Sequence, residues 1–118
     1  MPSPALGPEE VVEGVVGALR ASRETGAGTL WEFAAQKLRG SVGGKKHLLR
    51  LLGNELFAPL CEWGGLDAAP LERIGDSARQ MLMVAQGDEK AYYLVSLALS
   101  KRDDRRDCWL ITGLERLQ

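Results

Sequence analysis

The stretch Cys108-Trp109-Leu110-Ile111-Thr112-Gly113 decides the fold class, because it lies in the last of three strand-like runs. All three are rich in β-branched, aromatic and long aliphatic residues. They cover 78–86, 91–100 and 107–117. The connections at 87–89 and 102–106 are short and polar, as in antiparallel hairpins. The carboxyl-terminal part of the chain therefore predicts an antiparallel meander.

The half of the chain before these runs has helical periodicity. Pro8 suits a first helical position, where its missing N–H costs nothing. Apolar residues follow at helical spacing: Val11, Val12, Val15, Val16 and Leu19. We therefore expect a helix over 8–23, in which Gly14 and Gly17 allow close approach of another element.

Two further helices are expected. Residues 26–28 are interpreted as a loop, and Thr29-Leu30-Trp31-Glu32 matches a capping box that would start the second helix. That helix should end near Gly40, and a third should cover 45–53.

A change of character follows these helices. The segment 56–63 is apolar but broken by Pro59, which predicts an extended linker or an edge segment. A short strand is expected over 70–74. The order of elements predicts an α+β fold with three N-terminal helices packed on a curved antiparallel β-sheet. A chain of 118 residues fits one domain, over 8–118, with 1–7 as a flexible lead-in.

Composition excludes several classes of partner. The net charge is −1, so no strong field attracts nucleic acid or an anionic membrane, and no apolar run approaches the ~18 residues of a membrane span. Cys61 and Cys108 are far apart, and no signal peptide pattern begins the sequence, which favours free thiols in a reducing compartment. We expect an intracellular soluble protein of the cytoplasm or an organelle stroma; a targeting segment could still precede the sequence.

The strand faces indicate a dimer. Residues 91, 93, 95, 97 and 99 form an apolar face, while the opposite face, with Tyr92, Leu94 and Ser96, is mixed and uncharged. A solvated sheet face should carry more charge. Tyr92, Leu94 and Ser96 are therefore candidates for a face that a second copy or another protein covers.

Helices followed by a curved meander that ends in an aromatic-aliphatic-Gly strand resemble the nuclear transport factor 2-like superfamily. Ketosteroid isomerase, scytalone dehydratase and SnoaL-type polyketide cyclases share its cone-shaped, cystatin-like roll. The local match is closest to an uncharacterised domain-of-unknown-function family of plants, algae and bacteria. The resembling stretches are 11–19, 33–34, 48–52, 58–60, 78–80 and 108–113. The resemblance implies a cone and a pocket within it, but no chemistry.

No catalytic or metal-binding set is evident. Gly40 and Gly44 frame three residues where a phosphate loop needs four, and His47 is the only histidine, which disfavours a metal site. The carboxylates lie in turns, at helix starts or among polar neighbours. We therefore expect no cofactor and assign no catalytic residue.

Large side chains could instead line the mouth of a pocket, although such residues are more often core. The candidates are Trp31, Trp63, Met81, Met83, Tyr93 and Trp109. Three functions stay open: a non-catalytic interaction or assembly module, which is favoured; a binder of a small apolar ligand in the cone; and a lyase or isomerase of the SnoaL or ketosteroid isomerase type.

Overall fold

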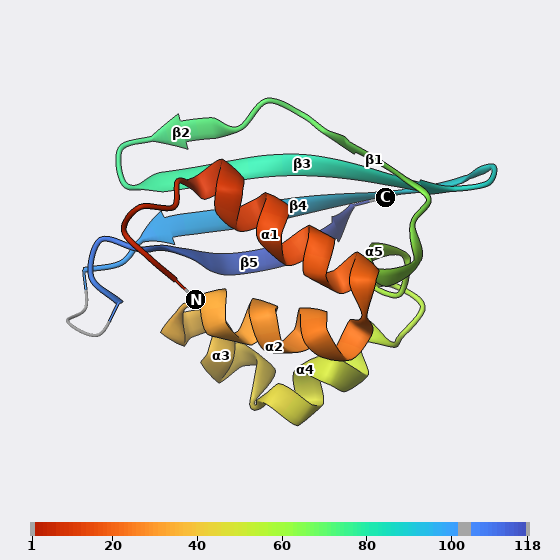
Figure 1. Cartoon of the computed structure of the whole chain (residues 1–118), viewed down its shortest axis with the longest axis horizontal. Coiled ribbons are helices and arrows are strands. Elements are labelled where there is room, and N and C mark those ends of the chain that lie inside the picture. Colours follow the sequence, from red (N-terminus) through yellow and green to blue (C-terminus); the bar gives the residue numbers. More distant parts are fainter. Residues whose placement is uncertain (1, 102–104, 118) are drawn as a thin grey trace.

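Helices cover one face of an antiparallel sheet in the computed structural model, which describes residues 2–101 and 105–117 (Figure 1). The helices are α1 (Pro8–Ala21), α2 (Arg23–Phe33), α3 (Gln36–Val42), α4 (Lys45–Leu52) and α5 (Pro59–Glu62). The strands are β1 (Gly65–Ala68), β2 (Glu72–Ile74), β3 (Ser77–Gln86), β4 (Glu89–Leu99) and β5 (Trp109–Leu117). The predicted α+β class, with helices first and an antiparallel meander last, is confirmed.

The sheet has five strands in the order β1-β3-β4-β5, and β2 pairs with β3 on the same side as β1. A tight turn with Gly87 at φ 62° joins β3 to β4 and sets Gln86 opposite Glu89. The predicted strand at 70–74 is β2, whereas β1 was not predicted, since Gly65 and Asp67 are poor strand formers. Of the predicted polar connection 102–106, residues 102–104 lie outside the described part of the chain.

The boundary between the first two helices was predicted wrongly, because α2 begins earlier than expected. Ser22 caps α2, its Oγ accepting from the Thr25 N–H at 3.4 Å, so the helix runs through the predicted loop 26–28.

The first two helices pack closely at Gly26. A Cβ at Gly26 would lie 2.4 Å from Leu19 Cα. At Gly14 and Gly17 a Cβ would meet nothing within 4 Å. The close approach therefore occurs at Gly26 and not at the two glycines of α1.

The predicted second helix is split by the edge of the sheet. Ala34 forms a parallel bridge with Ile111, and the Ala35 N–H donates to the Ile111 carbonyl at 2.8 Å. This pairing draws the backbone out of the helix, and α3 begins only at Gln36. The Arg39 guanidinium then donates to the Trp31 carbonyl at 2.8 Å, near the end of α2.

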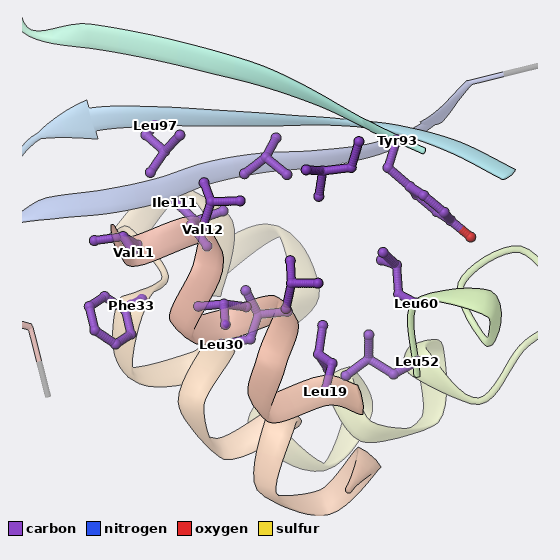
Figure 2. Close-up of a cluster of buried hydrophobic side chains, with 14 of the residues drawn as sticks. Val11, Val12, Leu19, Leu30, Phe33, Leu52, Leu60, Tyr93, Leu97 and Ile111 are labelled. Atoms are coloured by element: carbon purple, nitrogen blue, oxygen red, sulfur yellow. The ribbon is translucent and has the colours of Figure 1, made fainter. Parts of the chain in front are cut away.

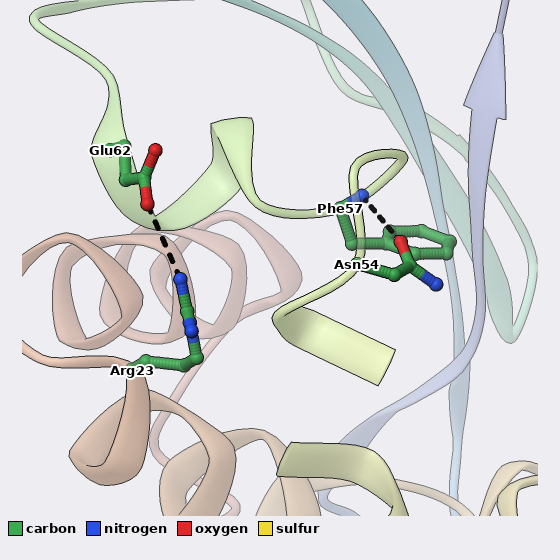
Figure 3. Close-up of polar contacts among 4 residues, drawn as sticks. All are labelled: Arg23, Asn54, Phe57 and Glu62. Carbon is green, nitrogen blue, oxygen red and sulfur yellow. Dashed lines mark hydrogen bonds and ion pairs between the residues drawn. The ribbon is translucent and has the colours of Figure 1, made fainter. Parts of the chain in front are cut away.

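The segment 56–63 is not an extended linker, because it holds the one-turn helix α5. Pro59 occupies the first turn of α5, where the missing N–H of a proline costs no intrahelical hydrogen bond. Before it, Asn54 Oδ1 accepts from the Phe57 N–H at 3.1 Å, and Arg23 pairs with Glu62 at 3.3 Å (Figure 3).

The core lies between the helices and the inner face of the sheet (Figure 2). Its largest side chains include Leu19, Leu30, Leu60, Tyr93 and Leu97. None of the helices within the described residues is both long and apolar enough to cross a membrane.

Candidate functional site

The outer face of the sheet, away from the helices, gathers several large apolar side chains that the core does not use. Directly opposite residues of antiparallel strands share a face. Met81 lies opposite Leu94, and Met83 lies opposite Tyr92. On the next strand, Leu117 lies opposite Tyr92. We call these five residues the outer stripe.

Members of the outer stripe are partly open to solvent. Met81 is 46% exposed and Tyr92 is 38% exposed, while Leu94, Met83 and Leu117 are half-buried. On β2, Ile74 pairs with Ser77 at the end of the same face and is 83% exposed. Apolar side chains exposed together on one face are typical of an interaction surface.

Two hollows flank an ion pair on this face. Arg79 Nε donates to Glu72 Oε1 at 2.7 Å, and both residues border both hollows. The larger hollow has a volume of about 410 Å³ and lies over the small side chains Ser77, Ser96 and Ala98. The smaller one, of about 280 Å³, borders Met81, Leu94 and Leu117. The face thus offers both ridges and recesses to a partner.

The interior between helices and sheet is filled. The cavity lined there by Val12, Leu30, Leu82, Val95 and other apolar residues has a volume of about 20 Å³. This is the space of about one water molecule. A small apolar ligand has no room at this position.

The six residues predicted to line a pocket mouth lie on different surfaces. Met81 and Met83 are on the outer face, and Tyr93 and Trp109 are buried on the inner side. The remaining two, Trp31 in α2 and Trp63 after α5, are partly buried. The structure brings the first pair beside Tyr92, Leu94 and Ser96, the three residues predicted for a dimer face.

Tyr93 is the largest polar side chain in the core. Its hydroxyl donates to the Leu56 carbonyl at 2.5 Å, and Arg116 lies over its ring at 5.5 Å. Burial raises the pKa of the Tyr93 phenol, while Arg116 opposes that rise. Burial likewise raises the pKa of the Cys61 thiol, against the effect of Arg23. Both groups are therefore neutral at ordinary pH, which gives no activated nucleophile.

Acidic groups lie outside the core. Every Asp and Glu within residues 2–101 and 105–117 is exposed, and the buried polar residue there is Gln80, whose amide donates to the Ala69 carbonyl at 2.8 Å. The same residues contain no group of three His, Cys, Asp or Glu placed to hold a metal. His47 is exposed on α4, and Cys61 and Cys108 are buried free thiols.

Sequence reasoning missed Ile74 and the two hollows. The outer stripe could have been predicted from the sequence, because a two-residue turn at Gly87-Asp88 sets Gln86 opposite Glu89. That register also sets Met81 opposite Leu94. The position of Ile74 had no such signal, since β2 is a short strand after an irregular segment.

In comparisons with protein-family models, with curated proteins and with solved structures, this chain has no match.

Proposed function

We propose that the chain is a non-catalytic assembly module that pairs with a second copy of itself through the outer face of its sheet. The observation that carries this proposal is the outer stripe, five large apolar side chains gathered on a face that the helices do not cover. Burying such side chains is the main favourable term in protein association.

The size of the face suits a second copy. β3 has 10 residues, which span ~34 Å at ~3.4 Å per residue, and four strand positions at ~4.8 Å cover ~19 Å. The flat area is then roughly 650 Å², and side chains raise the accessible area above that value. A stable interface of standard size buries about 800 Å² on each partner. The face is therefore large enough for a modest dimer.

The charges on the face also suit a copy of the same chain. They include Arg79 and Lys90 as cations and Asp67, Glu72 and Glu115 as anions. A partner of uniform charge would meet like charges somewhere on this surface. A second copy presents both signs, two cations and three anions, and can set each against its opposite.

The resemblance to the nuclear transport factor 2-like cone is retained as a proposal about the fold. It is supported by helices on one face of an antiparallel meander and by the bulge between Ser96 and Leu97, which bends the sheet. The filled interior and the exposed carboxylates favour assembly over ligand binding or lyase and isomerase chemistry.

The proposal is tested by light scattering on variants of matched chemistry. Leu94→Lys places a charge in the outer stripe and should weaken dimerisation at least about 30-fold, because two copies of the substitution meet in one interface. Leu56→Lys is the control, since the Leu56 side chain is 51% exposed in the loop before α5 and is not part of the outer face. A dimer that survives Leu94→Lys but not Leu56→Lys would refute the assigned face.

A further inference from the structure

A cleft at the end of the β3–β4 hairpin has a composition unlike that of the outer face. Its volume is about 120 Å³. One wall is the segment around α5, with Glu55, Pro59 and Trp63, and the other is the hairpin from Val84 to Ala91. The Gly64 N–H donates to the Ala85 carbonyl at 2.8 Å and ties the two walls together. Arg116 of β5 completes the lining.

Arg116 is fixed in place without a carboxylate partner. Its Nη1 donates to the Leu56 carbonyl at 2.9 Å and approaches the Tyr93 hydroxyl at 3.5 Å. The guanidinium also lies over the ring of Tyr93, which is fully buried and therefore rigid. Within residues 2–101 and 105–117, Arg116 makes no ion pair, and its Nε and Nη2 donate no hydrogen bond. A pre-oriented guanidinium with free donors is the protein group best suited to a carboxylate.

Other charged residues of the lining indicate which group a ligand would carry at the end away from Arg116. Glu55 and Glu89 supply two carboxylates, while the Lys90 side chain belongs to the outer face and reaches the cleft only through its backbone. One guanidinium and two carboxylates line the cleft, so it does not favour an anion such as phosphate. It favours a molecule that carries a positive and a negative group.

An unsatisfied donor lies in the same wall. The indole Nε1 of Trp63 is buried and has no hydrogen-bond acceptor within the described chain. The Trp63 carbonyl, by contrast, is held by Arg20 Nε at 2.5 Å. Buried donors without an acceptor are rare in folded proteins. Because this N–H has almost no accessible surface, it lies behind the wall of the cleft and serves as a reporter on the cleft, not as a contact for a ligand.

We propose that this cleft binds a small zwitterion of the free α-amino acid class. The carboxylate lies on the open side of the Arg116 guanidinium, and the ammonium lies toward Glu55 and Glu89. The cleft has about six times the volume of the interior cavity of about 20 Å³, which suits a small amino acid such as alanine. The inference does not depend on the pairing of two copies.

The test is a heteronuclear NMR titration of the full chain with four probes: alanine, acetate, methylamine and inorganic phosphate. Alanine should cause saturable shifts at the Trp63 indole N–H and at the amides of Lys90 and Ala91. Acetate and methylamine should bind at least about tenfold more weakly, because each satisfies one end of the cleft. Shifts of equal affinity with acetate or phosphate, or no saturable shifts with alanine, would overturn the proposal.

Three variants keep the test independent of folding. Arg116→Lys retains the charge but not the planar fork, and should weaken alanine binding about tenfold. Glu55→Gln with Glu89→Gln removes the ammonium site at exposed positions and should weaken alanine binding without affecting acetate. Lys37→Gln, at an exposed position of α3, is the control that should leave alanine binding unchanged. Alanine binding that is unaltered in the glutamate double variant contradicts the assigned orientation.

Discussion

Gly26 of α2 packs tightly against Leu19 of α1. A Cβ at Gly26 would lie 2.4 Å from Leu19 Cα and 2.7 Å from Leu19 N, so backbone as well as side chain would have to move. We predict that Gly26→Ala lowers the free energy of unfolding by roughly 1–3 kcal/mol, the usual cost of overpacking. Urea denaturation followed by circular dichroism measures this change.

Gly17 is the matched control for this substitution. It also lies within a helix, but a Cβ there would meet nothing within 4 Å. Gly17→Ala should raise stability by about 0.5–1 kcal/mol, because alanine loses less backbone entropy in a helix. If both substitutions stabilise the protein, the close packing of α1 on α2 is wrong.

The buried side chains of Cys61 and Tyr93 should make the folded protein less stable at alkaline pH. Burial raises the pKa of Cys61 above its ordinary 9.0 and that of Tyr93 above its ordinary 10.0. Below those ordinary values both groups are protonated in the folded and unfolded states. As pH rises through them, the unfolded chain loses protons that the folded chain keeps. The contribution of these two groups to stability is therefore complete below their ordinary pKa values, and it is lost as the pH rises toward their raised pKa values in the folded chain.

Urea unfolding measured from neutral pH to above 10.0, the ordinary pKa of tyrosine, tests this prediction. Tyr93→Phe and Cys61→Ala should each flatten the alkaline decline, whatever their effect at neutral pH. The unmodified chain, measured over the same pH range, is the reference for these slopes. A decline that is unchanged in Tyr93→Phe would contradict the role given to this phenol.

Among the elements, strands were predictable from the sequence to a greater extent than helix boundaries. The three long strands were expected at 78–86, 91–100 and 107–117, because alternation and polar turns are local signals. The start of α2 depends on Ser22, and the break before α3 depends on the pairing of Ala35 with Ile111, which is a tertiary contact. Such contacts override the local capping pattern at Thr29.

The loop before α5 is held by the Asn54 side chain together with the Asn54 carbonyl, which accepts from the Phe57 and Ala58 N–H groups. Asn54 Oδ1 accepts from the N–H groups of Leu56 at 2.9 Å and Phe57 at 3.1 Å. This turn presents the Leu56 carbonyl to Tyr93 and Arg116. We predict that Asn54→Ala costs about 1 kcal/mol and speeds hydrogen exchange at Leu56, whereas the Phe57 N–H keeps the Asn54 carbonyl as an acceptor at 3.2 Å. Asn54→Asp keeps the acceptor and should leave that exchange slow; equal exchange in both variants would contradict the role of Oδ1.

At the scale of the whole molecule, the candidate site could be predicted only in part. Tyr92, Leu94 and Ser96 were assigned to one face by alternation alone. Met81 and Met83 were interpreted as pocket residues, because assigning them to the same face requires the register between β3 and β4. The cleft beside Arg116 joins segments around residues 55–63, 84–91 and 116, and no local pattern predicts that juxtaposition.

The most direct test of the central claim is the mass of the unmodified chain by sedimentation equilibrium over a wide range of concentration. One copy has a mass of 12.8 kDa. If the outer face joins two copies, the apparent mass rises with concentration and levels off at twice that value. A mass that stays at one copy up to the highest concentration would contradict the proposed assembly.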